Sequence, residues 1–143
     1  MKILLAIDGS PLSLFAVHHA LRLRRAGLAA RYVLVNVQEP PSLYEVVVAH
    51  DPERLDDVRR AAGADLLATA EALLKGANAE WESEVAGGDP GHVIVELAEN
   101  YRCDAIVLGA GPEGALGSVA QSVLKHSPVP VTVVREIEAP AAG

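Results

Sequence analysis

The amino-acid sequence predicts an α/β protein, a single domain over residues 1–143 with an open parallel sheet and helices on both faces. Short apolar segments alternate with helical patterns along almost the whole chain. Most of the apolar segments are continuous, as expected for strands that are covered on both sides. Half of the residues are hydrophobic but only 3% are aromatic, so we expect a core of alanine, valine and leucine. In such folds, ligands bind beyond the carboxyl ends of the strands.

Five strands are expected, each an apolar run bounded by residues that favour turns. They cover residues 3–7, 32–37, 81–85, 105–108 and 129–134. The third run differs from the others, because Trp81, Ser83 and Val85 alternate with glutamates. This alternation predicts a strand with one solvated face at an edge of the sheet, where the glutamates would discourage unwanted pairing.

Four helices are expected between the strands. They begin at residues 10, 51, 89 and 117. Ser10-Pro11 supplies a capping hydroxyl and a proline at the first helical position, and Asp89-Pro90 repeats this arrangement. The apolar stripe of the first helix is Leu12, Phe15, Ala16, Ala20 and Leu23, and that of the second is Leu55, Val58, Ala62, Leu66, Ala70 and Leu73. Residues 40–51 are left unassigned, and residues 136–143 are predicted to be a frayed tail.

Charge and composition exclude several classes of function. The net charge of −7 argues against binding to nucleic acid, which needs a basic face. No apolar run approaches the roughly 18 residues of a membrane span. The single cysteine, Cys103, allows no internal disulfide, and the five histidines lack the spacing of a metal site. We therefore expect a cytoplasmic protein with no bound metal of its own.

The glycine-rich stretch 109–118, between a strand and a helix, is the strongest candidate site. Glycines let the backbone approach a ligand closely, and the first N–H groups of a helix attract anions, so the stretch suggests phosphate binding. One interpretation is a dinucleotide fingerprint, G-x-G-x-x-G, formed by Gly109, Gly111 and Gly114. Its position at the fourth strand counts against this interpretation, since that fingerprint normally opens its domain.

A second interpretation rests on four blocks of sequence that stand in order along the chain. They are Ile3-Leu4-Leu5-Ala6-Ile7-Asp8-Gly9-Ser10, Gly87-Gly88-Asp89-Pro90, Cys103-Asp104-Ala105-Ile106-Val107-Leu108-Gly109, and Leu116-Gly117-Ser118-Val119-Ala120 with His126-Ser127-Pro128-Val129-Pro130-Val131 after it. Together they resemble the universal stress protein family over nearly the full length.

The resemblance implies a Rossmann-like sheet with strand order 3-2-1-4-5 and a homodimer formed through the last strand, 129–134. ATP-binding members carry G-x2-G-x9-G-[ST] after the fourth strand. By this resemblance Gly109 matches the first glycine, and Gly117 and Ser118 match the last glycine and the hydroxyl. Further matches are Ala6, Asp8 and Val37 around adenine and ribose, and Leu108 and Val119 beside the phosphate turn.

The chain departs from the family motif in the phosphate turn. The segment from Gly109 to Gly117 is too short for the motif, and using Gly111 and Gly114 as the first pair leaves it shorter still. The turn contains Glu113, and no basic residue lies between Arg102 and Lys125. This setting disfavours a tightly held triphosphate. We expect AMP or ADP to be easier to place than ATP, which would bring Mg²⁺.

Other functions remain open at this stage. The glycines could serve only the packing of a strand against a helix, and Asp8 could serve only its turn. The protein would then be a dimeric interaction module that binds an unknown protein partner and no nucleotide. Catalysis is not expected, although slow ATP hydrolysis stays open, because only Asp8 offers itself as a metal ligand.

Overall fold

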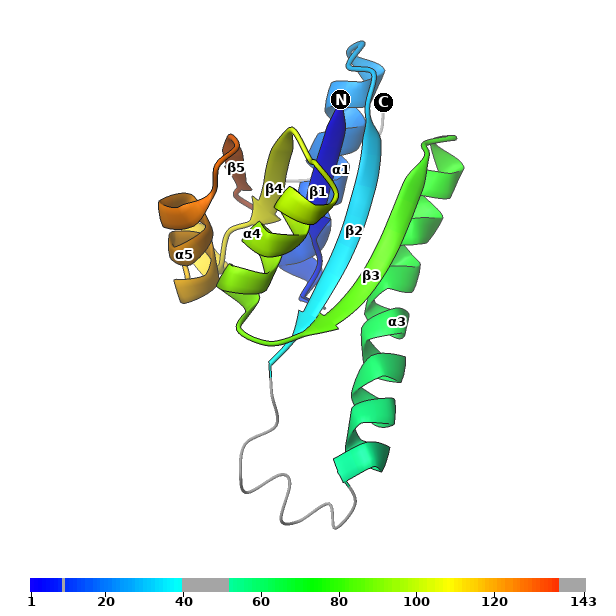
Figure 1. Ribbon diagram of the computed structural model, residues 1–143. Coiled ribbons are helices and arrows are strands. Elements are labelled where there is room, and N and C mark those ends of the chain that lie inside the picture. Colours follow the sequence, from blue (N-terminus) through cyan, green and yellow to red (C-terminus); the bar gives the residue numbers. More distant parts are fainter. Residues whose placement is uncertain (9, 40–51, 137–143) are drawn as a thin grey trace.

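The structure, a computed structural model, describes residues 1–8, 10–39 and 52–136, and within them the side chains other than those of 52–60, 62 and 66. Five strands form one parallel sheet in the order β3-β2-β1-β4-β5. They are β1 (Lys2–Ala6), β2 (Arg31–Gln38), β3 (Trp81–Gly87), β4 (Ala105–Gly109) and β5 (Val131–Val134). The predicted α/β class and the strand order implied by the resemblance are confirmed (Figure 1). The unassigned segment 40–51 and residues 137–143 of the predicted tail lie outside the described residues.

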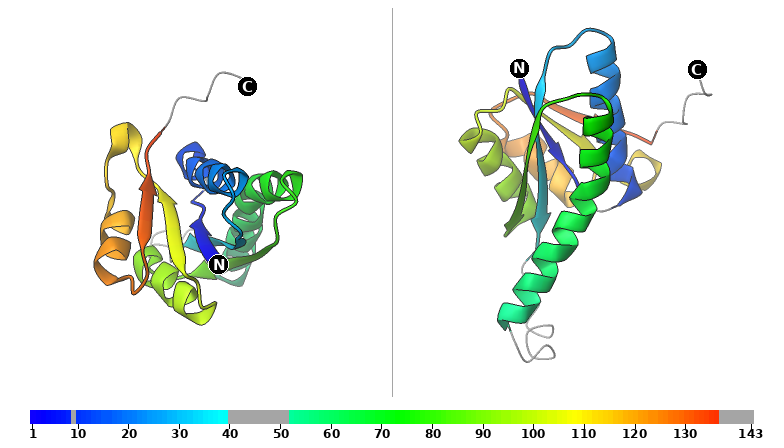
Figure 2. Two further views of the ribbon diagram at one scale, coloured as in Figure 1. Left: turned by 90° about the horizontal axis from the view of Figure 1, so that it is seen from above. Right: turned by 90° about the vertical axis from the view of Figure 1, so that its right-hand side faces the viewer.

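Two layers of helices cover the sheet (Figure 2). The helices are α1 (Leu14–Arg25), α3 (Pro52–Gly76), α4 (Pro90–Asn100) and α5 (Ser118–His126), with short 3-10 turns η1 (Pro11–Ser13) and η2 (Pro112–Gly114). One core joins α1 and α3 to one face of the sheet, and a second core joins α4 and α5 to the other. Alternate residues of each central strand enter the two cores; Leu4 and Leu5 of β1 are both fully buried.

The helices begin where the sequence predicts but bury slightly different stripes. Ser10 Oγ accepts a hydrogen bond from the Leu12 N–H at 3.1 Å, and the first turn is 3-10 before α1 begins. In α1, Val17 is fully buried and Leu23 is 37% exposed, so the predicted stripe was wrong at its end. In α3, Leu74 is fully buried where Leu73 was expected, while the side chains of Leu55, Val58, Ala62 and Leu66 lie outside the described part.

The outer strands also show small differences from the prediction. β3 is an edge strand as predicted, but Ser83 is exposed and Glu84 is half-buried. Glu84 accepts a hydrogen bond of 2.8 Å from the Tyr101 hydroxyl, which gives its half-buried carboxylate a partner and raises the pKa of that hydroxyl to about 12. β5 begins at Val131, two residues later than expected, because Pro130 has no N–H to give to the ladder.

Candidate functional site

A cavity of about 490 Å³ lies at the carboxyl end of the sheet, where β1 and β4 are neighbours. The chain leaves β1 toward α1 on one face and leaves β4 toward α5 on the other (Figure 1). This is the point in an open α/β sheet where ligands bind. Nine of the ten residues predicted for the site line the cavity: Ala6, Asp8, Val37, Leu108, Gly109, Gly111, Gly117, Ser118 and Val119.

The turn after β1 fixes an exposed carboxylate at the cavity wall. Asp8 Oδ1 accepts a hydrogen bond of 2.8 Å from the Ser10 N–H, which ties the start of η1 back to the end of β1. Ser10 in turn caps η1, and the Ser13 hydroxyl donates to the Ser10 carbonyl at 2.8 Å. Asp8 therefore serves its turn, and its carboxylate still has acceptor capacity for a ligand hydroxyl.

Gly109, at the end of β4, permits a close approach between two stretches of backbone. A Cβ at this position would lie 2.5 Å from the Leu12 carbonyl oxygen. The next N–H groups are used within the protein, since Ala110 donates to Val134 at 2.8 Å and Gly111 donates to Ala115 at 2.7 Å. This part of the turn is explained by packing, as the alternative interpretation proposed, and it offers little to a phosphate.

The N-terminus of α5 is the part of the glycine stretch that is open to a ligand. Gly117 is the N-cap residue, makes no side-chain cap, and has open space around the position of a Cβ. Ser118, Val119 and Ala120 follow it along the cavity wall. The first N–H groups of a helix have no acceptor within the helix, so this end can accept an anion.

Gly114 is the predicted site residue that does not line the cavity. It has a φ of +78° and packs directly against the guanidinium of Arg135. Arg135 Nη2 also donates a hydrogen bond to the Glu113 carbonyl at 3.4 Å. The sequence contains no cation near this turn, but the pairing of β4 with β5 brings one from 22 residues further along the chain. The strand order was the signal that could have located Arg135.

The described residues that line the cavity have a distinct charge and polarity. They include two acidic side chains, Asp8 and Glu39, and no basic one. Val35, Val37, Ile94 and Leu108 give the cavity an apolar wall. Neither Glu39 nor Ile94 was predicted as a site residue, because the site prediction followed the glycine stretch and the positions that the resemblance matches to a nucleotide.

Helix α4 closes one side of the cavity with Pro90 and Ile94. Its N-cap is Asp89, whose carboxylate accepts hydrogen bonds from His92 Nδ1 at 2.7 Å and from the His92 N–H at 3.2 Å. These hydrogen bonds lower the pKa of the Asp89 carboxyl. The predicted cap is therefore formed, and its hydrogen bonds favour the ionised side chain.

No described helix has the length and hydropathy needed to cross a membrane. Within the described part of the chain, no three histidine, cysteine or acidic residues gather as a metal-binding group would.

Comparisons with known proteins agree with the geometry. A model of the universal stress protein family matches residues 1–135. Universal stress protein MJ0531 of Methanocaldococcus jannaschii is 30% identical over 140 residues, which cover 94% of this chain and 82% of that protein. A universal stress protein family member from Burkholderia pseudomallei superimposes with a TM-score of 0.73 at 26% identity, covering 93% of this chain and 94% of that one. A universal stress protein solved in complex with cAMP superimposes with a TM-score of 0.67 at 25% identity, covering 94% and 95%. The chain therefore belongs to the universal stress protein family.

Proposed function

We propose that this protein is a stress-response sensor that binds an adenine nucleotide with few phosphate charges in the cavity beside Asp8. The observation that carries the proposal is the convergence of three distant segments, 6–8, 35–39 and 117–120, on one hollow at the switch point of the sheet. The cAMP bound to one structural relative supports an adenine nucleotide as the class of ligand.

Each part of the cavity suits one part of such a nucleotide. The apolar side chains of Ala6 and Val37 would border the base, and Asp8 would accept hydrogen bonds from ribose hydroxyls. The N–H groups of Ser118 and Val119, with the Ser118 hydroxyl, would hold a phosphate.

The charge of the lining sets the order of preference among nucleotides. Asp8 adds an exposed carboxylate to the lining, and no cation is among the described lining residues, so each added phosphate meets more repulsion. We expect AMP and cyclic AMP to bind at least as well as ADP, and ATP to bind only with Mg²⁺. The protein would act by binding and not by catalysis.

A cytoplasmic homodimer is the proposed working form. The outer edge of β5 is unpaired within the described sheet, and an edge strand can pair with a second chain. Size-exclusion chromatography with light scattering tests this state directly. A monomer at micromolar concentration would contradict it.

The nucleotide proposal is tested by thermal unfolding with AMP, cyclic AMP, ADP and ATP, each with and without Mg²⁺. A ligand at about 100 times its dissociation constant should stabilise the fold by roughly 2.7 kcal/mol and raise the midpoint by several degrees. Gly117→Val should abolish the shift, because the added side chain enters the space in front of α5. Gly76→Val is the matched control, since Gly76 also has open space around it but lies on α3, away from the cavity.

The outcomes separate two functions. A shift that Gly117→Val and Asp8→Ala remove, and that Gly76→Val keeps, supports nucleotide binding. No shift with any nucleotide at millimolar concentration overturns it and favours the interaction module. The packing role of Gly109 and the absence of cations from the described lining are the observations on the side of that module.

A further inference from the structure

A second hollow, of about 630 Å³, lies between α1 and α3. These two helices cover the face of the sheet opposite α4 and α5 (Figure 2). We call it the α1–α3 groove. Its lining residues are His18, Leu21, Arg24, Arg25, Ala72, Leu73, Gly76 and Ala77. Every charged or titratable side chain in this set is a base, although the chain as a whole has a net charge of −7.

The floor of the groove is apolar and built from small or half-buried side chains. Leu21 and Leu73 pack against the core from the two helices and remain half-exposed toward the groove. Ala72 and Gly76 are exposed on α3, and neither extends far enough to fill the space between the helices. An apolar side chain from another molecule would find room and contact there.

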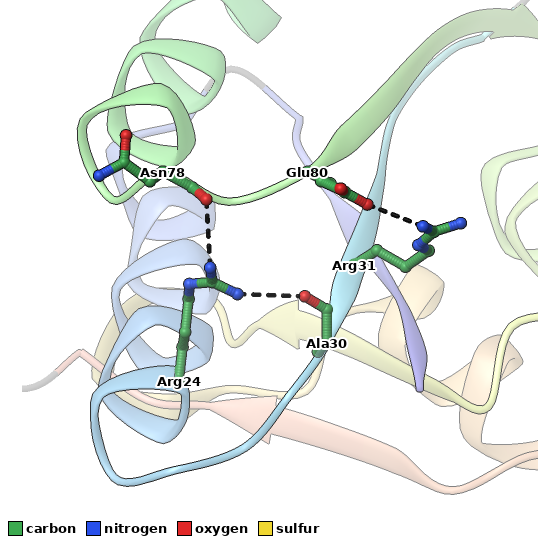
Figure 3. Close-up of polar contacts among 5 residues, drawn as sticks. All are labelled: Arg24, Ala30, Arg31, Asn78 and Glu80. Atoms are coloured by element: carbon green, nitrogen blue, oxygen red, sulfur yellow. Dashed lines mark hydrogen bonds and ion pairs between the residues drawn. The ribbon is translucent and has the colours of Figure 1, made fainter.

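Arg24 holds its positive charge in a fixed place at the groove. Its guanidinium donates to the Ala30 carbonyl at 3.3 Å and to the Asn78 carbonyl at 3.1 Å (Figure 3). These bonds join α1 to the loop before β2 and to the turn after α3, and no carboxylate among the described residues pairs with the charge. Arg25 and His18 are exposed beside it.

The neighbouring carboxylates are engaged elsewhere. Glu80, just before β3, forms an ion pair of 2.8 Å with Arg31 at the start of β2 (Figure 3). Glu71 accepts hydrogen bonds from Trp81 at 3.1 Å and from Ser83 at 3.2 Å. Among the described residues, no carboxylate forms an ion pair with the three bases of the groove. Basic residues in the last turn of α1 favour the helix dipole, but this does not account for His18, two turns earlier, or for the apolar hollow.

We propose that the α1–α3 groove docks a short acidic segment of a partner protein, with an apolar side chain of that segment between Leu21 and Leu73. The charge complementarity identifies the partner: carboxylates would pair with Arg24, Arg25 and His18. A short peptide meets only the groove. A nucleic acid or an anionic membrane extends beyond it and meets the negative charge of the rest of the chain.

The test is an NMR titration of isotope-labelled protein with a synthetic peptide. The peptide has about a dozen residues, all glutamate except for two leucines four positions apart. Amide shifts should map to α1 and to the last turns of α3, and affinity should fall as salt rises. A peptide with glutamine in place of glutamate and one with serine in place of leucine should both bind more weakly.

Two pairs of variants assign the effect to the groove. Ala72→Glu should weaken the peptide about threefold to fivefold and Ala72→Lys should tighten it by a similar factor, as expected for one exposed charge pair. Ala64→Glu and Ala64→Lys, on an exposed position of α3 outside the groove, should each change affinity less than about twofold.

Several outcomes would overturn the proposal. They are no binding of the acidic peptide, shifts that map elsewhere, or equal effects of the changes at Ala72 and Ala64. A short DNA duplex or phosphatidylserine vesicles that bind this groove more tightly than the peptide would also overturn it, in favour of another class of partner. The nucleotide proposal is decided by Gly117→Val and Asp8→Ala at the carboxyl end of the sheet, and the groove proposal by the variants at Ala72 and Ala64 on α3, so the two proposals fail independently.

Discussion

The cavity beside Asp8 and the α1–α3 groove are both hollows of several hundred cubic ångströms, but they are built in opposite ways. The cavity is formed by turns and a helix N-terminus at the end of the sheet, and its described charged side chains are carboxylates. The groove is formed by the sides of two helices, and its charged side chains are bases. We therefore expect backbone groups to dominate recognition in the cavity and side-chain charge to dominate it in the groove, so the cavity should respond to added volume and the groove to altered charge.

The largest expected effect is the loss of stability caused by a substitution at Gly109. Its comparison with a substitution at Gly117 distinguishes a glycine needed for packing from one that leaves room for a ligand. Gly109→Ala places a Cβ against the Leu12 carbonyl, which is backbone and cannot turn aside, so we expect a loss of about 2 kcal/mol in the free energy of unfolding. Gly117→Ala, which meets open space at an ordinary φ of −69°, should change it by less than about 0.5 kcal/mol. Urea unfolding measures both. Equal costs would show that the two glycines do not divide into a packing and a binding role.

The difference between the two glycines illustrates which features of the site could be predicted from the sequence and which could not. Strands and glycine turns are local features, so continuous apolar runs predicted the strands, and the stretch from Gly109 to Ser118 predicted one wall of the cavity. The resemblance to the family supplied the strand order and the lining residues Ala6, Asp8 and Val37. The sequence could not say which glycine faces Leu12 and which faces open space, because that depends on contact between β4 and η1.

Features made by helix packing and strand neighbours were missed for the same reason. The stripe predicted for α1 included Leu23, which is exposed, and omitted Val17, because a helical period of this length tolerates a shift of one position. The groove follows from the mutual position of α1 and α3, which no motif records. Arg135 reaches Gly114 only because β5 lies beside β4.

A smaller effect on stability is expected from substitutions at the two arginines of the groove. Comparing them distinguishes the contribution of the Arg24 hydrogen bonds from that of positive charge alone. Arg24→Met keeps the apolar stem but removes hydrogen bonds to Ala30 and Asn78, so we expect a loss of about 1 kcal/mol in unfolding free energy. Arg25→Met removes a similar charge from an exposed position and should cost less than about 0.5 kcal/mol. Urea unfolding of the two variants checks this order. If Arg25→Met is as costly as Arg24→Met, the groove is held by general charge and not by the two carbonyl contacts.

The smallest expected effect is a pH dependence of the stability that Asp89 gives to α4. It should affect the helix beside the cavity and leave the α1–α3 groove unchanged. Asp89 caps α4, the helix that brings Pro90 and Ile94 to the cavity, and its hydrogen bonds with His92 lower the pKa of its carboxyl. A lowered pKa means that the ionised cap stabilises the fold above the ordinary carboxyl range, and that this stability is lost as the pH falls through the folded-state pKa.

Asp89→Ala should therefore have a slightly lower thermal midpoint than the wild type at neutral pH. This difference should shrink in acid, where protonation of Asp89 weakens the cap of the wild type. Asp89→Asn keeps an oxygen acceptor for the cap but does not titrate, so its midpoint should fall less than that of the wild type on acidification. Thermal unfolding between neutral pH and about pH 2, which lies well below the ordinary range for a carboxyl group and so reaches a lowered pKa, measures all three proteins. A difference between wild type and Asp89→Ala that stays constant across this range would mean that the charge on Asp89 does not contribute to the cap. Amide exchange in α1 and the last turns of α3 should not respond to either substitution, since the α1–α3 groove lies across the sheet from α4.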